Sequence, residues 1–194
     1  MSLITNGFLR TLYNEAQSGT YEHTSISFWG YLLSKVYFAE DRFYVDAQKP
    51  ASPNDPLRRV DEQVKYFEHG TLKTRILCFH EGKKPGANTD DMRIVEGQAF
   101  EACATYCDSA GITHVYALTT IGIFARTWKY SHDTRKLTPH FGSAGLMNRA
   151  AYVDADSTHA AQLDQSFRHM KQFPPSEVAE PQQPGHYVYA TGSG

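Results

Sequence analysis

The chain has 194 residues, with 19 Lys and Arg against 21 Asp and Glu, so its formal net charge is −2. This length suits one domain with its own core, and a hydrophobic content of 41% excludes the composition of disordered chains. The near-neutral charge excludes a polybasic protein that binds nucleic acid or membranes by net attraction alone. Any such binding must therefore come from a local site.

The lack of a membrane helix or leader pattern in the sequence, together with the few cysteines, suggests an intracellular protein. No apolar run approaches the roughly 20 residues of a membrane helix, and the first ten residues lack a basic start followed by an apolar stretch. Cys78, Cys103 and Cys107 are too few for a disulfide framework. We expect no membrane partner and a location in the nucleus or cytoplasm.

Hydrophobic periodicity predicts alternating helices and strands along most of the chain. Asn6 caps the first helix, Thr24 or Ser25 the second, and Ser157 the last. Gly111 ends the long central helix. The expected elements are helices over 7–16 and from about 25 to 36, strands over 42–47, 60–67 and 74–80, a helix over 92–107, strands over 112–120 and 123–130, a short strand at 152–153 and a last helix ending near 172.

Two stretches are rich in residues that break regular structure. Residues 49–57 contain three prolines and are expected to form a loop, and residues 131–149 to be irregular. The prolines at 174 and 175 end the last helix. We therefore predict one domain over residues 1–173, followed by a flexible Pro/Gln-rich tail over 174–194.

Charged residues gather where one apolar strand ends. The strand over 76–80 runs directly into Glu81, Gly82 and Lys83. Side chains alternate along a strand, so Glu81 and Lys83 lie on one face, about 7 Å apart. Asp61 lies on the preceding strand and reaches Glu81 if the two strands form a hairpin. The sequence therefore predicts two carboxylates beside a lysine.

Two carboxylates with an adjacent lysine suit metal-assisted hydrolysis of phosphodiesters. Mg²⁺ and Mn²⁺ prefer oxygen ligands and keep several waters, so Asp61, Glu81 and the backbone carbonyl of Gly82 are the candidate metal ligands. Lys83 would orient the attacking water or offset charge on the phosphate. The expected cofactor is Mg²⁺ or Mn²⁺.

These residues, with Glu96-Gly97-Gln98 on the following helix, resemble the PD-(D/E)xK nuclease superfamily over roughly residues 25–130. The amino-acid sequence also resembles uncharacterised nuclease-like proteins of fungi, in the stretches 59–61, 95–99, 115–117 and 126–128. The resemblance implies an α/β fold with a restriction-endonuclease-like core, a mixed central sheet of about four or more strands flanked by helices.

The resemblance also implies roles for individual residues. Asp61 and Glu81 would be metal ligands, Lys83 the catalytic lysine and Gln98 a site-facing residue, with Glu22 as an extra acid. The family's aspartate often follows a proline, whereas Asp61 follows a valine. Asp55 is the alternative, but we prefer Asp61, because Asp55 lies between two prolines in the expected loop.

Basic residues surround the candidate site in the sequence. Arg58, Arg59 and Lys84 are the candidate contacts to a phosphate backbone, and an ordinary solvated surface is the simpler interpretation. Phe124, Trp128 and Tyr130 would offer a stacking surface for bases, although alternate positions on a strand favour the core.

The sequence gives weaker support to three further functions. The cysteines could bind zinc, but no second pair repeats the ligand spacing, which favours buried thiols. Cysteine-protease chemistry with His114 or His140 lacks a cysteine at a helix start beside a positive group. Thirdly, the proline-rich tail could serve a protein-interaction or effector module.

We expect metal-dependent hydrolysis of nucleic acid, DNA rather than RNA. The alternative is a catalytically inactive nuclease fold that binds nucleic acid or a protein partner. A homodimer is compatible with the resemblance, but no exposed apolar stripe in the sequence demands one.

Overall fold

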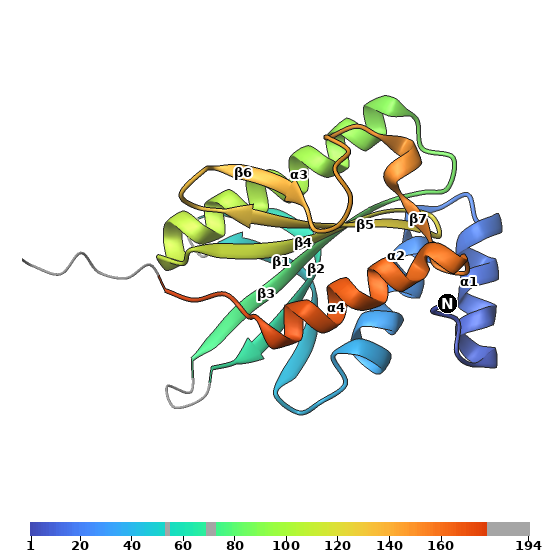
Figure 1. The fold of residues 1–194 in the computed structure, drawn as a ribbon, viewed down its shortest axis with the longest axis horizontal. Helices are drawn as coiled ribbons and strands as arrows, with labels where there is room; N and C mark the ends of the chain where they lie inside the picture. The colour runs from blue at the N-terminus through green and yellow to red at the C-terminus, as the bar shows by residue number, and fades with distance from the viewer. Residues whose placement is uncertain (53–54, 69–72, 178–194) are drawn as a thin grey trace, which may run out of the picture.

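A mixed β-sheet forms the centre of the protein (Figure 1). The computed structural model describes residues 1–52, 55–68 and 73–177, without the side chains of 51, 52 and 55–58. The elements are α1 (Gly7–Ser18), α2 (Glu22–Leu32) with a π-helical turn (Leu33–Tyr37), β1 (Phe43–Ser52), β2 (Asp55–Phe67), β3 (Thr74–Lys83), α3 (Thr89–Ala110), β4 (His114–Ile121), β5 (Phe124–Ser131), β6 (Lys136–Pro139), β7 (Val153–Asp154) and α4 (Ala161–Gln172), with 3₁₀ turns at Arg149–Ala151 and Thr158–Ala160.

The strands follow the order β1-β2-β3-β4-β5-β6, and β7 pairs with β5. Only β3 and β4 run parallel among the described strand pairs. A parallel pair needs a long crossover, and α3 supplies it. The protein is therefore α/β with a mixed sheet flanked by helices, as predicted.

The two faces of the sheet carry different helices (Figure 1). Val115 and Ala117 of β4 pack in the cluster beneath α3. Tyr116 and Leu118 pack in the cluster shared by α1, α2 and α4. This alternation buries β4 on both faces of the sheet.

The first helix begins as predicted and the second does not. Asn6 Oδ1 accepts a hydrogen bond from the Leu9 amide at 2.9 Å. Helix α2 begins at Glu22, and the predicted caps Thr24 and Ser25 lie inside it. Ser25 Oγ instead donates to the Gly122 carbonyl at 2.8 Å, so tertiary packing uses the hydroxyl expected at the cap.

The predicted loop over 49–57 was wrong, because β1 and β2 extend through most of it as a long hairpin. Pro50 lies in β1, which is the edge strand, where one side makes no ladder hydrogen bonds and proline is tolerated. Residues 53–54 lie outside the described residues. Asp61 consequently lies in the middle of β2 rather than at its start.

Two predictions for the later part of the chain were also wrong. The stretch 131–149, expected to be irregular, contains β6, which is too short for periodicity to reveal. Ser157 precedes a 3₁₀ turn and makes no capping bond; its hydroxyl donates to the Asp154 carbonyl. Helix α3 has the predicted Gly111 end, and a capping box of Asn88 and Asp91 begins it. Residues 178–194 of the predicted tail lie outside the described residues.

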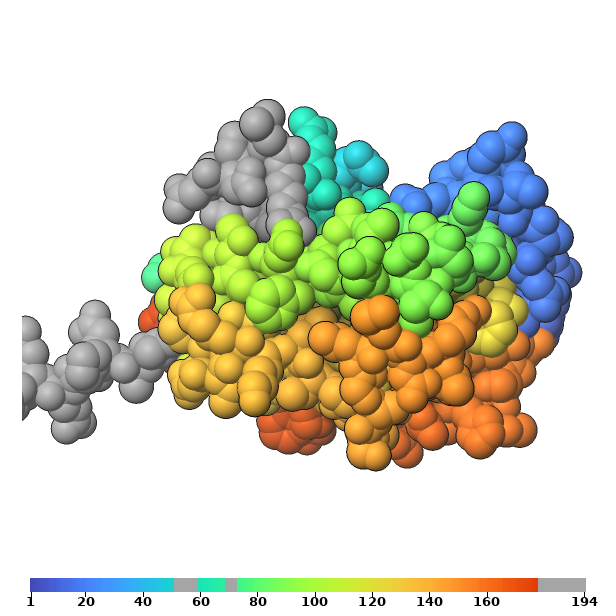
Figure 2. Space-filling model, turned by 90° about the horizontal axis from the view of Figure 1, so that it is seen from above, coloured from blue at the N-terminus to red at the C-terminus, as the bar shows by residue number. Residues whose placement is uncertain are grey.

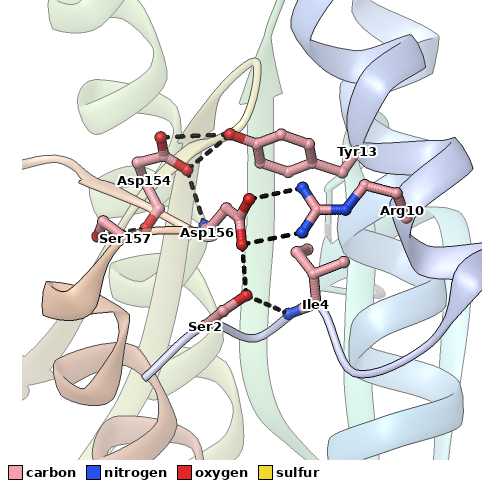
Figure 3. A network of polar contacts seen from close by, with 7 residues as sticks. All are labelled: Ser2, Ile4, Arg10, Tyr13, Asp154, Asp156 and Ser157. Carbon is pink, nitrogen blue, oxygen red and sulfur yellow. Dashed lines mark hydrogen bonds and ion pairs between the residues drawn. The ribbon is translucent and has the colours of Figure 1, made fainter.

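The amino-terminal segment is bound to β7 and to the turn that follows it (Figure 3). Tyr13 of α1 donates to Asp154 at 3.0 Å, and Arg10 forms an ion pair with Asp156 at 2.5 Å. The hydrogen bond from Arg10 and a second from Ser2 lower the pKa of Asp156. These contacts join residues about 140 positions apart in the sequence and hold α1 against the end of the sheet. No helix among the described residues is long and apolar enough to cross a membrane.

Two helical glycines give a matched test of how closely α2 packs. A Cβ at Gly30 would clash with Glu62 Oε1, whereas a Cβ at Gly97 of α3 would meet open space. We expect Gly30→Ala to destabilise the protein by about 1–3 kcal/mol, and Gly97→Ala to stabilise it by up to about 1 kcal/mol. Urea unfolding measures both, and similar effects of the two substitutions would contradict the packing of α2 on Glu62.

Candidate active site

The carboxylate of Asp61 binds the end of the neighbouring strand β3. Its Oδ2 accepts a hydrogen bond from the backbone amide of Gly82 at 2.8 Å. A larger side chain at Gly82 would force its neighbours to move, because a Cβ would clash with the end of the Ile26 side chain of α2 and approach Thr120 Oγ1. This contact brings Asp61 to the Glu81-Gly82-Lys83 segment.

Glu81 lies beside Asp61 on the same face of the sheet. Glu62 and His80 are the last paired residues of the antiparallel ladder of β2 and β3, and continuing its register by one step sets Asp61 opposite Glu81. Directly opposite residues share a face, with Cβ atoms about 5 Å apart. Glu81 is 3% exposed. The two carboxylates are therefore adjacent, one buried and one half-buried.

Lys83 and Glu22 meet at the rim of this site. Lys83 Nζ lies 3.3 Å from Glu22 Oε2, and the two side chains are 17% and 43% exposed. Such a partly exposed ion pair contributes about 0–1 kcal/mol. The ammonium can therefore leave Glu22 for another anion at small cost.

Gln98 lies on the flank of α3 nearer to β2 and β3. The buried stripe of α3 centres on Val95, Ala99 and Ala102. Glu96 lies on one side of that stripe, where it contacts Tyr152, and the helical period of 3.6 sets Gln98 on the opposite side. Gln98 thus occupies the flank on which the carboxylates lie.

The predicted phosphate contacts are dispersed. Arg59 is exposed and donates to the Gln48 carbonyl at 3.4 Å, and Lys84 is exposed just beyond β3. The side chains of Arg58 and of the alternative acid Asp55 lie outside the described part of the chain.

Sequence reasoning missed a polar row that continues from Glu81 across the sheet. Glu81 pairs with Thr119 of β4, and Thr119 with Arg126 of β5. Tyr152 hydroxyl bonds Thr119 at 2.9 Å and donates to Glu96 at 3.1 Å. Burial is the main cause that raises the pKa of Glu96 and lowers that of Arg126. Glu96 was the signal in the sequence that could have indicated this row, because it is a carboxylate next to the buried stripe of a helix.

A second network lies behind the site, on the α2 face, and was also missed. His80 Nδ1 is 2.7 Å from Glu62 Oε2, and its Nε2 is 2.9 Å from Thr120 Oγ1. His80 is fully buried, and these bonds connect β2, β3 and β4. The network therefore supports the register that brings Asp61 to Glu81.

The aromatic surface suggested for base stacking is core. Trp128 and Tyr130 are fully buried beneath α3. Phe124 is half-buried, with the Arg149 guanidinium 4.4 Å from its ring centre. These rings therefore contribute to the core and are not available to bases.

The three cysteines are free and buried, as predicted. Burial raises the pKa of Cys107 to about 12, with a smaller effect from Asp108, and raises that of Cys78 further. A thiol with a raised pKa is a poor nucleophile and metal ligand. His114 and His140, the suggested partners of a nucleophile, instead pack around Tyr116.

We expect His140 to make the stability of the protein sensitive to acid. Burial, with smaller effects from His169 and Lys129, lowers the pKa of His140 to about 4, whereas an unfolded histidine titrates near 6.5. Between these values the unfolded chain binds more protons, so we expect stability to fall as the pH falls from about 6.5 to about 4. His114 packs on the same Tyr116 ring as His140. Burial also lowers the pKa of His114.

Thermal unfolding between pH 7 and 4.5 measures this dependence. We expect His140→Gln to flatten the decline of Tm with falling pH, and the exposed His159→Gln to leave it unchanged. An equally steep decline in His140→Gln would contradict the assignment.

The donor set at Asp61 and Glu81 fits a hard divalent cation that keeps several waters. Both acids supply oxygen ligands, which Mg²⁺ and Mn²⁺ prefer, and such ions are commonly held by one or two carboxylates. The described residues contain no cluster of three or more His, Cys, Asp or Glu side chains that could hold a metal. Water and substrate oxygens would therefore complete the coordination.

Comparison with known proteins adds no relative from which a role could be transferred. No family model, no curated protein and no solved structure matches the chain. The functional argument therefore depends on the residues and contacts described above.

Proposed function

We propose that the protein hydrolyses phosphodiester bonds of nucleic acid with Mg²⁺ or Mn²⁺. One observation carries the proposal: the Asp61 carboxylate binds the amide of Gly82 at the end of β3, and Gly82 lies between Glu81 and Lys83 in the chain. Adjacent carboxylates with a lysine at a strand end are the arrangement that resembles the PD-(D/E)xK nucleases. That resemblance favours DNA as the substrate.

In this proposal Asp61 and Glu81 hold the cation, with the Gly82 carbonyl as a further oxygen donor. A divalent ion there would offset charge on the phosphate and lower the pKa of a bound water. The hydrogen bond from the Gly82 amide fixes the Asp61 carboxylate, and burial restricts that of Glu81. Both carboxylates are therefore oriented before substrate binds, which reduces the cost of reaching the transition state.

Lys83 acts on the substrate. Its ammonium exchanges Glu22 for the attacking water or a phosphate oxygen, where it stabilises the charge that develops during attack. Glu22 holds the ammonium at the rim of the site between turnovers. Gln98, on the α3 flank nearer to β2 and β3, would orient the phosphate through its amide.

The test is incubation of purified protein with plasmid, single-stranded DNA and RNA in Mg²⁺, Mn²⁺ or EDTA. We expect cleavage that requires metal and is lost in Lys83→Ala prepared in the same way. Equal cleavage by wild type and Lys83→Ala, or no cleavage with either metal, would refute the proposal. Binding without cleavage would favour an inactive nuclease fold that recognises nucleic acid or a protein.

A further inference from the structure

A cavity of about 730 Å³ lies between the β1–β2–β3 part of the sheet and the carboxyl-terminal end of α3. Its lining includes Gln63, which is two residues from Asp61 and therefore on the same face of β2. Figure 2 shows α3 stretched across this side of the molecule. Four cations contribute to the lining, namely Lys49, Lys65, Lys73 and Arg75.

Two of these cations have carboxylate partners close in the sequence. Lys65 Nζ lies 2.8 Å from Asp46 on β1, and Arg75 Nη2 lies 3.0 Å from Glu68 at the end of β2. Arg75 is nearly buried, with 8% of its side chain exposed. These acids orient the two cations without filling the cavity, since neither acid is among its lining residues.

Arg75 has a second carboxylate partner that comes from the far end of the described chain. Glu177 Oε1 lies 2.5 Å from Arg75 Nη2 and 3.8 Å from Lys73 Nζ. The Glu177 side chain is 59% exposed. An exposed carboxylate thus binds the most buried cation of the cavity.

The segment that follows α4 delivers Glu177 to this position. Tyr66 hydroxyl donates to the Pro175 carbonyl at 2.8 Å, and the Thr113 amide donates to the Ser176 carbonyl at 2.9 Å. Glu177 itself forms a bridge with Ile112. Backbone contacts therefore hold the segment, and the Glu177 carboxylate is not required to anchor it.

We propose that this cavity binds the backbone phosphates of a nucleic-acid strand held at the candidate active site, and that Glu177 competes with one phosphate for Arg75 and Lys73. The inference rests on the proposed function. Carboxylate and phosphate accept the same forked hydrogen bonds from arginine. Because the Glu177 side chain is 59% exposed, a phosphate can take its place while Arg75 keeps an anionic partner.

The distance along β3 determines how long a nucleic-acid strand must be to contact both Arg75 and the candidate active site. Arg75 and Glu81 are six residues apart on β3, with a register shift against β2 between them, so they lie at most about 20 Å apart at roughly 3.3 Å per residue. A stacked nucleic-acid strand advances about 3.4 Å per nucleotide, so up to about six nucleotides separate the scissile bond from the phosphate at Arg75.

The experiment measures binding of a fluorescein-labelled 12-nucleotide single strand in EDTA, where cleavage does not interfere. We expect Glu177→Gln to tighten binding about 3–10-fold, and Lys73→Gln to weaken it and to reduce the salt dependence by about one counterion. Glu101→Gln, at an exposed position of α3, changes the net charge equally and should leave the affinity unchanged. Thermal unfolding checks that each variant is folded.

Three results would overturn the inference: equal effects of Glu177→Gln and Glu101→Gln, no effect of Lys73→Gln, or a hexaglutamate peptide that competes as well as an unlabelled 12-nucleotide strand. The binding experiment and the cleavage assay fail separately. A tighter Glu177→Gln complex without metal-dependent cleavage would preserve the phosphate cavity and refute the nuclease. Metal-dependent cleavage with no effect of Glu177→Gln on binding would preserve the nuclease and refute the phosphate cavity.

Discussion

Glu81→Gln is expected to reduce metal-dependent cleavage by about a thousandfold while the protein stays folded. Glutamine keeps the size of a side chain that is 3% exposed, so packing changes little. It removes the negative charge that would hold a divalent ion beside Asp61. The loss of one group that stabilises the transition state costs about 10²–10³ in rate, and a weaker metal site adds to this loss. Initial cleavage rates over a range of Mg²⁺ concentrations give the measurement.

Glu101→Gln is the matched control, because it changes the same charge at an exposed position of α3. It should retain wild-type cleavage. A further contrast separates binding from chemistry: Lys83→Ala should lose rate at every Mg²⁺ concentration, whereas part of the loss in Glu81→Gln should recover at high Mg²⁺. Wild-type rates in Glu81→Gln would exclude this carboxylate from the reaction.

Trp29→Ala is expected to lower the free energy of unfolding by about 3–5 kcal/mol. Trp29 is fully buried, and its Nε1 donates to the Gly122 carbonyl at 2.8 Å. The substitution leaves a cavity between α2 and the sheet and removes one donor from a buried carbonyl. Since single domains are stable by about 5–15 kcal/mol, this is a large share of the total.

Trp29→Phe separates the two effects, because it retains much of the ring volume and removes only the indole N–H. We expect it to cost about 1–2 kcal/mol. Ile94→Ala, on the exposed side of α3, should stay within about 0.5 kcal/mol of wild type. Urea unfolding compares the three variants, and equal losses for Trp29→Ala and Ile94→Ala would contradict the burial of α2 on the sheet.

The placement of α2 also connects stability to the candidate site. Ser25 and Trp29 both donate to the Gly122 carbonyl in the β4–β5 turn. One turn earlier, Glu22 meets Lys83. Sequence reasoning named Glu22 through the resemblance alone, and the contact depends on how α2 lies across the strands.

The adjacency of Asp61 and Glu81 was predictable because it depends on a local feature. The two strands are consecutive and antiparallel, and period-two alternation decides which side chains share a face. The functional roles of these residues stay predictions, as does the metal. The hairpin over 49–57 was not predictable by composition, since an edge strand accepts the proline that usually marks a loop.

The amino-acid sequence by itself determined the order of the main helices and strands, the central helix ending at Gly111, the burial of the three cysteines and the Glu81-Gly82-Lys83 strand end. These features follow from local periodicity, backbone preference and hydrophobicity. Only the tertiary structure decided that Glu81 is followed across the sheet by Thr119 and Arg126, and that Glu177 reaches Arg75. Such contacts join residues up to about 100 positions apart, and they depend on strand register and chain path, which no local pattern encodes.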